Sequence, residues 1–98
     1  MSGLAFEWDP RKAAANSRKH GVTFAEASTV FSDEQALLIA DSEHSGEEDR
    51  FVLLGLGTRL RLLVVCHSYR QGATRIRLIS ARKASKSERE DYFSRWKA

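Results

Sequence analysis

The chain has 98 residues, of which 42% are hydrophobic and 30% charged, with one proline and one cysteine. This composition is typical of a single globular domain, 1–98, and leaves no room for a second one. The longest uncharged apolar run, 62–66, is far shorter than the roughly 20 residues of a membrane-spanning helix, and the N-terminus lacks a signal-peptide pattern. We therefore expect a cytoplasmic protein, since a reducing compartment suits its single thiol, Cys66.

The formal net charge of +3 conceals a separation between two parts of the chain. Residues 1–58 carry five basic and ten acidic side chains, whereas residues 59–98 carry eleven basic and three acidic ones, a net charge of +8. Eight of those eleven cations are arginines, whose planar guanidinium suits phosphate groups. The pattern indicates an anionic partner, with nucleic acid as the first candidate and an ordinary solvated surface as the alternative.

The first third of the chain predicts two helices after a short extended segment, 6–8. Asp-Pro at 9–10 is typical of an N-cap followed by proline at the first helical position, and the helix ends at Gly21. A Thr-x-x-Glu capping box then opens a second helix over 23–31. Two helices thus precede the predicted sheet.

The rest of the chain predicts four strands and a C-terminal helix. Three apolar ranges, 51–56, 61–68 and 74–80, are separated by short turns, which is typical of an antiparallel meander, and 36–40 is a shorter strand candidate. The middle range is apolar on both alternations, so it should lie centrally. A capping box at 85–88 opens the last helix, whose aromatic stripe should dock on the sheet. The predicted fold class is α+β, with about four antiparallel strands, two N-terminal helices and one C-terminal helix.

No pattern in the sequence indicates a metal or cofactor. The histidines at 20, 44 and 67 are widely spaced, and neither Cys-x-x-Cys nor His-Glu-x-x-His occurs. A glycine-rich phosphate loop and a Gly-x-Ser-x-Gly elbow are also missing. We therefore expect chemistry without a metal or a cofactor.

The register of the last hairpin decides which side chains share a face of the sheet. A three-residue turn at 71–73 would place His67 opposite Arg77 and on one face with it. A two-residue turn would place His67 opposite Ile76 and disperse the cluster.

In the first register, one face and the strand end beyond it gather cations. They are Arg61, Arg75, Arg77, Arg82 and Lys83. Such a face suits a phosphodiester, because guanidinium groups stabilise the charge that develops on the phosphorus oxygens in the transition state. RNA also carries its own nucleophile, the 2′-hydroxyl, which needs only alignment, a base and an acid.

Two boxes in the chain are specific: Lys-His-Gly-Val-Thr-Phe at 19–24 and Ile-Arg-Leu-Ile-Ser-Ala-Arg-Lys-Ala at 76–84. Together with 6–12, 41–51 and 61–67, they resemble the BrnT family of bacterial type II toxins over nearly the whole chain. The resemblance implies a RelE-like fold, metal-independent endoribonuclease activity that inhibits translation and growth, and a DNA-binding antitoxin, BrnA, as partner in a hetero-oligomer.

Roles for individual residues follow from the chemistry as hypotheses. His67 or Glu48 would be the base that takes the 2′-hydroxyl proton, and His44 would protonate the leaving 5′-oxygen. Arg50, Arg77 and Arg82 would stabilise the transition state, and Arg61, Arg75 and Lys83 would hold the substrate. The alternative is a non-catalytic module whose basic face binds RNA or docks an acidic protein.

Overall fold

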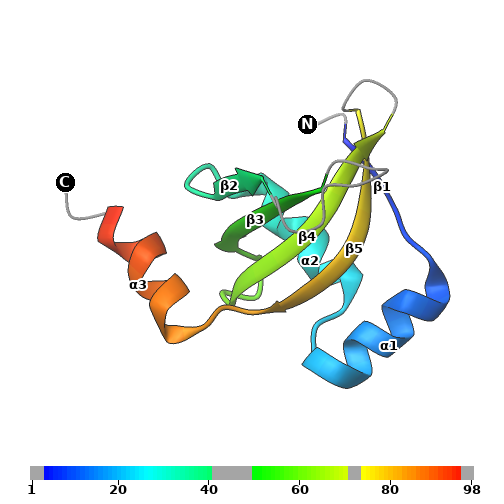
Figure 1. Cartoon of the computed structure of the whole chain (residues 1–98), viewed down its shortest axis with the longest axis horizontal. Coiled ribbons are helices and arrows are strands. Elements are labelled where there is room, and N and C mark those ends of the chain that lie inside the picture. Colours follow the sequence, from blue (N-terminus) through cyan, green and yellow to red (C-terminus); the bar gives the residue numbers. More distant parts are fainter. Residues whose placement is uncertain (1–3, 41–49, 71–73, 96–98) are drawn as a thin grey trace.

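The computed structural model describes residues 4–40, 50–70 and 74–95, which form one five-stranded sheet and three helices (Figure 1). The elements are β1 (Ala5–Glu7), α1 (Pro10–His20), α2 (Phe24–Ser28), the 3-10 helix η1 (Thr29–Ser32), β2 (Leu37–Ala40), β3 (Phe51–Leu56), β4 (Leu62–Arg70), β5 (Arg75–Lys83) and α3 (Lys86–Ser94). The strand order is β1-β5-β4-β3-β2. None of the described helices is long and apolar enough to cross a membrane.

The sheet differs from the expected one in strand number and direction. The α+β class is confirmed, but the segment predicted merely as extended is β1, a fifth strand that pairs parallel with β5. Only Ala5, Phe6 and Glu7 take part. Three residues are too few to show the alternating pattern of a strand, so the local sequence could not indicate that this segment joins the sheet. It does so by pairing with β5.

The predicted helix ends are largely confirmed. The Asp9 carboxylate accepts the backbone N–H of Arg11 at 2.8 Å, and Gly21 ends α1 with a left-handed φ of 69°. The Thr23 hydroxyl accepts the N–H of Glu26 at 3.1 Å, but the Glu26 carboxylate binds Arg61 instead of completing the capping box. α2 is correspondingly short and continues into η1.

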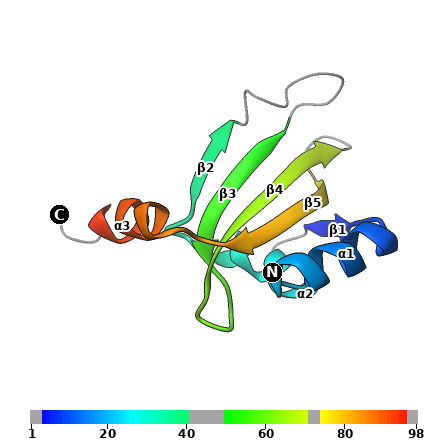
Figure 2. The same ribbon diagram turned by 60° about the horizontal axis from the view of Figure 1, so that its bottom comes forward.

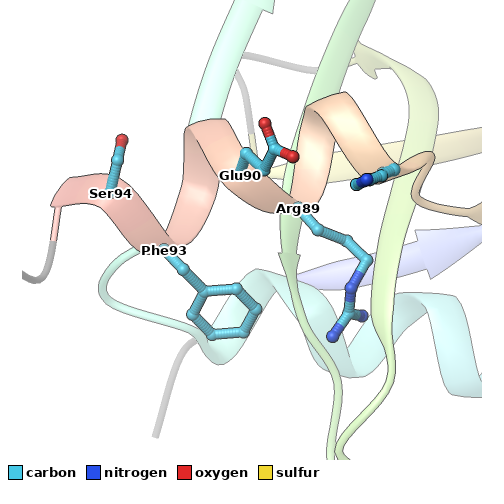
Figure 3. Close-up of a pocket in the computed structure, with 5 residues that line it drawn as sticks. Arg89, Glu90, Phe93 and Ser94 are labelled. Carbon is cyan, nitrogen blue, oxygen red and sulfur yellow. The ribbon is translucent and has the colours of Figure 1, made fainter.

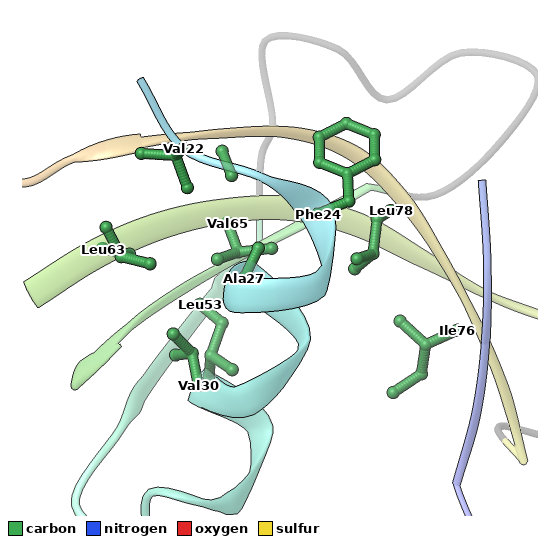
Figure 4. Close-up of a cluster of buried hydrophobic side chains, with 10 residues drawn as sticks. Val22, Phe24, Ala27, Val30, Leu53, Leu63, Val65, Ile76 and Leu78 are labelled. Atoms are coloured by element: carbon green, nitrogen blue, oxygen red, sulfur yellow. The ribbon is translucent and has the colours of Figure 1, made fainter. Parts of the chain in front are cut away.

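Helices α1 and α2 lie on one face of the sheet, and α3 lies at the far end (Figure 2). On the helix-covered face, Phe24, Ala27 and Val30 pack against apolar side chains of β3, β4 and β5 (Figure 4). The opposite face, here called the outer face, holds a smaller cluster of Leu54, Leu62, Val64 and Tyr92. β4 contributes to both clusters and is the central strand, as its two-sided apolar pattern predicts.

α3 is anchored through two members of the predicted aromatic stripe, since Tyr92 belongs to the outer-face cluster and Phe93 packs against it. Tyr92 is the more deeply placed of the two. Its side chain is fully buried, and its hydroxyl donates to Asp33 Oδ2 at 2.5 Å. Burial and the neighbouring carboxylate raise the pKa of Tyr92 to about 12, so the phenol stays protonated. The stripe's last aromatic residue, at 96, lies outside the described residues.

Asn16 joins α1 to β5 beyond the end of β1. Its amide nitrogen donates to Ala81 O at 2.8 Å and its amide oxygen accepts the Ala81 N–H at 3.0 Å. The same nitrogen donates to Val22 O at 3.0 Å. One buried side chain therefore completes the hydrogen bonding of β5 where a strand neighbour is missing.

Candidate functional site

The register of the β4–β5 hairpin differs from both predicted alternatives. Arg70 pairs with Arg75, Ser68 with Arg77, and His67 with Leu78. The connection thus spans the four residues 71–74, not two or three. Because strand residues alternate between faces, His67 and Arg77 point to opposite faces of the sheet. The predicted face that joins them is therefore wrong.

His67 belongs to the helix-covered core. It is 0% exposed, and its ring lies among those of Phe31, Phe51 and Tyr69, at a centroid distance of 4.8 Å from Phe31. Nδ1 lies 3.1 Å from Val65 O, and Nε2 lies 3.3 Å from the Tyr69 hydroxyl. Burial lowers the pKa of His67, which keeps the imidazole neutral. This placement provides no contact with a ligand on the outer face.

Arg61 also lies apart from the other predicted cations. Its Nε donates to Glu26 Oε2 at 2.7 Å, a second donor reaches Oε1, and Nη2 donates to Gly21 O at 3.0 Å. The Glu26 side chain is only 3% exposed, and the hydrogen bond from Arg61 lowers its pKa. Arg61 therefore compensates a buried carboxylate and ties the start of β4 to α2.

Three arginines of β4 and β5 gather on the outer face. Arg70 and Arg75 are direct cross-strand partners, and Arg77 lies opposite Ser68. Residues 68 and 70 alternate with the core-facing His67 and Tyr69, so they and their partners share the outer face. We call Arg70, Arg75 and Arg77 the arginine face.

The arginine face has an acidic neighbour on β1. Glu7 of β1 lies 3.5 Å from Arg70 and 3.6 Å from Arg75, measured between nitrogen and carboxylate oxygen. These two arginine side chains are 44% and 42% exposed. The Arg77 side chain makes no hydrogen bond or ion pair in the described part of the chain. Three guanidiniums thus lie close together on one face of the sheet, and this concentration of positive charge attracts an anion.

Arg82, expected just beyond the end of the last strand, lies within β5 and on the outer face, but it is already paired. It lies opposite Val64, and its two Nη atoms donate to the Glu88 carboxylate at 2.8 and 2.9 Å. Glu88 also accepts the Ser85 N–H at 2.8 Å in the capping box of α3. Arg82 lowers the pKa of Glu88 to about 2. Lys83 lies opposite Leu63, on the other face of the strand.

The remaining predicted residues flank or fall in the segment between β2 and β3. Arg50 directly precedes β3 and is half-buried, and continued alternation from Phe51 places it on the outer face beside Ser68. His44 and Glu48 lie outside the described residues. Ala40, which precedes that segment, pairs with Phe51 and so lies in the same part of the sheet as His67.

Sequence reasoning missed two members of the outer face, Arg70 and Glu7. β4 was expected to end at residue 68, yet it continues to Arg70, whose face could have been found by alternation from Ser68. Glu7 carried no such signal, because its contact depends on the parallel pairing of β1 with β5.

The structure also has two surface pockets that the three arginines do not line. One, of about 430 Å³, runs along α3 and is lined by side chains that include Arg89, Glu90 and Phe93 (Figure 3). The other, of about 250 Å³, lies between α1 and β5 and is lined by Lys12, Lys19 and other residues. Among the described residues, no group of three or more histidine, cysteine, aspartate or glutamate side chains is arranged to hold a metal ion.

Comparison with known proteins shows which family the chain belongs to. The sequence profile described as the ribonuclease toxin BrnT of type II toxin–antitoxin systems matches residues 8–88. The crystal structure of the Brucella abortus ribonuclease toxin BrnT has the same fold, with a TM-score of 0.63 and 24% identity over 85% of this chain and 99% of that one. Among curated proteins, no match is found. The profile covers most of the chain, so this protein belongs to the BrnT family of ribonuclease toxins of type II toxin–antitoxin systems.

Proposed function

We propose that this protein is a metal-independent endoribonuclease with a RelE-like fold, which cleaves RNA on its outer face and thereby inhibits translation and growth. The observation that carries the proposal is the arginine face, where three guanidiniums gather on two adjacent strands and Arg77 makes no hydrogen bond or ion pair within the described residues. Membership of a ribonuclease toxin family supports RNA as the anion.

The proposed reaction uses the nucleophile that RNA supplies. A base takes the proton of a 2′-hydroxyl while its oxygen forms a bond to the adjacent phosphorus. The bond from phosphorus to the 5′-oxygen breaks, and an acid protonates that oxygen. The products are a 2′,3′-cyclic phosphate and a 5′-hydroxyl, so no water, metal or cofactor enters this step.

The arginine face would bind the phosphate and its transition state. Arg77 would donate to the non-bridging oxygens, since its donors are not used elsewhere in the described part of the chain. Arg70 and Arg75, held loosely by Glu7, would orient the strand. Arg50 would lie close enough on the same face to assist.

Proton transfer would fall to His44 and Glu48, as acid and base. We give His67 no role in it, because the imidazole is buried on the other face. Arg61, Arg82 and Lys83 would act on RNA at most through long-range attraction, because Arg61 and Arg82 donate to carboxylates and Lys83 faces the other side.

The family also implies an antitoxin. We propose a cognate, BrnA-like DNA-binding antitoxin that forms a hetero-oligomer with the toxin and covers the arginine face with an acidic or amphipathic segment, since complementary charge speeds such association.

The test is incubation of the purified chain with an RNA and with a DNA of the same sequence, with and without excess chelator. The proposal expects RNA products that end in a 2′,3′-cyclic or 3′-phosphate, equal rates in chelator and intact DNA. Loss of cleavage in chelator would contradict the metal-independent mechanism.

A second candidate function is an RNA-binding module that represses without cleavage. It is favoured by one observation: His67, the one histidine on the described strands, is buried and cannot serve the outer face. Retention of RNA without products, in the same experiment, would support this candidate over the nuclease.

A further inference from the structure

The pocket between α1 and β5 is formed by side chains of both elements. It is lined by Lys12, Ala15, Asn16, Lys19 and His20 from α1, and by Ile79 and Ser80 from β5. β1 pairs with β5 only along 75–77, so the edge of β5 beyond that range faces α1. The Asn16 amide bonds both backbone groups of Ala81 and holds the two walls together.

The charged side chains that line the pocket are basic. Two lysines and a histidine line it, none of its lining residues in the described ranges is acidic, and the sequence of α1 contains neither Asp nor Glu. Lys19 and His20 lie in the last turn, where the helix dipole favours a cation. Lys12 lies near the helix start, where the dipole favours an acid, so helix stability does not account for it.

The pocket lies farther along the strand that carries Arg75 and Arg77. Ser80 lines the pocket and pairs with Cys66, which lies on the outer face between Ser68 and Val64. Along β5, Ser80 is three residues from Arg77, about 10 Å at the usual rise per residue. A single nucleic-acid strand that contacts Arg77 can therefore continue over the β5 edge to Ser80 and the lysines.

We propose that this pocket is a second phosphate-binding subsite, which holds an RNA phosphate next to the scissile one. Lys12 and Lys19 supply the opposing positive charge, and the Ser80 hydroxyl and the His20 ring supply hydrogen bonds. The identity of the ligand rests on the proposed function. RNA is favoured over an acidic peptide because the pocket is small, at about 250 Å³, and its Ser80 wall lies on the same strand as Arg77, three residues away.

The test measures binding of an RNA whose 2′-hydroxyls are methylated, so that it cannot be cleaved by its own 2′-oxygen. The variant is Lys12→Ala with Lys19→Ala. The matched control is Arg11→Ala with Arg18→Ala, which removes the same charge from the same helix at positions that do not line the pocket. Fluorescence anisotropy is recorded at several salt concentrations.

We expect the pocket variant to bind about 10-fold more weakly and its salt slope to fall by about 0.7, the value for one lost phosphate contact on a single strand. The control should change affinity by less than about 3-fold. Lys12→Arg with Lys19→Arg should restore binding. A dinucleotide, too short to reach the pocket from the arginine face, should bind the wild type and the variant equally.

Equal losses in the pocket variant and the control would overturn the inference, since they would reflect general charge alone. Unchanged RNA affinity with weaker antitoxin binding would overturn it in favour of a protein-docking role. If the wild type binds but never cleaves unmodified RNA, the proposed nuclease fails while the subsite stands. If it cleaves and the pocket variant matches the control in KM and kcat, the subsite fails alone.

Discussion

The arginines on the two faces of the sheet differ in the groups that surround them, although the sequence alone does not distinguish them. Arg61, at the helix-covered face, places donors on a buried carboxylate and a backbone carbonyl. Arg77, on the outer face, makes no hydrogen bond or ion pair within the described part of the chain. The difference shows that the local number of acids, rather than the number of arginines, decides which cations are free to meet a ligand.

Arg82 is an instructive intermediate. It lies on the outer face, yet Glu88 holds it in two parallel hydrogen bonds. Bidentate pairs of this kind are strong and directional, so this arginine mainly fixes α3 to β5. The face on which an arginine lies therefore does not by itself show that the arginine can bind a ligand. Its ion-pair partners must be known as well.

The largest effect on cleavage is expected when arginines are removed from the arginine face. Arg75→Ala with Arg77→Ala should lower the rate of RNA cleavage at saturating substrate by about 100-fold or more, because the transition-state charge loses its donors. Arg18→Ala with Arg59→Ala, which removes two exposed arginines elsewhere, should stay within about 3-fold. Full cleavage by a folded double variant would remove the proposed site.

The next largest effect, on stability, is expected at the pair of Arg61 and Glu26 on the helix-covered face. Glu26→Gln should lower the free energy of unfolding by about 2 kcal/mol, since it leaves Arg61 without its charged partner beside a buried side chain. Cleavage by the folded variant should be unchanged. Urea unfolding and a cleavage assay on the same sample check both, and a loss of activity without a loss of stability would contradict the division between the faces.

A smaller effect is expected at Arg82 and Glu88. Glu88→Gln should cost about 1 kcal/mol, because the pair is partly exposed. The pKa of Glu88 is lowered to about 2, so its contribution is complete above its unfolded pKa of 4.5 and is lost as the pH falls toward 2. The stability gap between wild type and variant, measured by urea unfolding, should therefore narrow below pH 4.5. A gap independent of pH would argue against this assignment.

The smallest effect is the pH dependence from His67. Its pKa is lowered by burial, so the folded state binds fewer protons than the unfolded state once the pH falls below 6.5, the ordinary pKa of histidine. Stability should decrease there, by less than about 1.4 kcal/mol per pH unit, the limit for one proton. His67→Gln should reduce that slope in urea unfolding and should leave cleavage in place. Abolished cleavage in a folded variant would return His67 to the site.

Much of the fold follows from local sequence patterns. The caps at Asp9, Gly21 and Ser85, and the central place of β4, depend on neighbouring residues and on two-sided apolar character, which a sequence displays directly. β1 could not be predicted as a sheet member, because its pairing partner is about 70 residues away in the chain.

The candidate site was harder to predict, because it depends on register. A connection one residue longer than expected moved every β4 partner by one position and separated His67 from Arg77. A further shift near Cys66 and His67 leaves Ile79 as an extra residue in β5. The pairs Arg61–Glu26 and Arg82–Glu88 add a second reason, since a cation's partner depends on the tertiary fold rather than on its own strand.

The most direct measurement of the central claim is NMR of the side-chain Nε–H groups of arginine during titration with the methylated RNA. We expect the signals of Arg70, Arg75 and Arg77 to shift on binding, whereas that of Arg61, held by Glu26, stays in place. Shifts confined to Arg61 or to Arg89 of α3, with Arg77 unaffected, would show that RNA binds elsewhere.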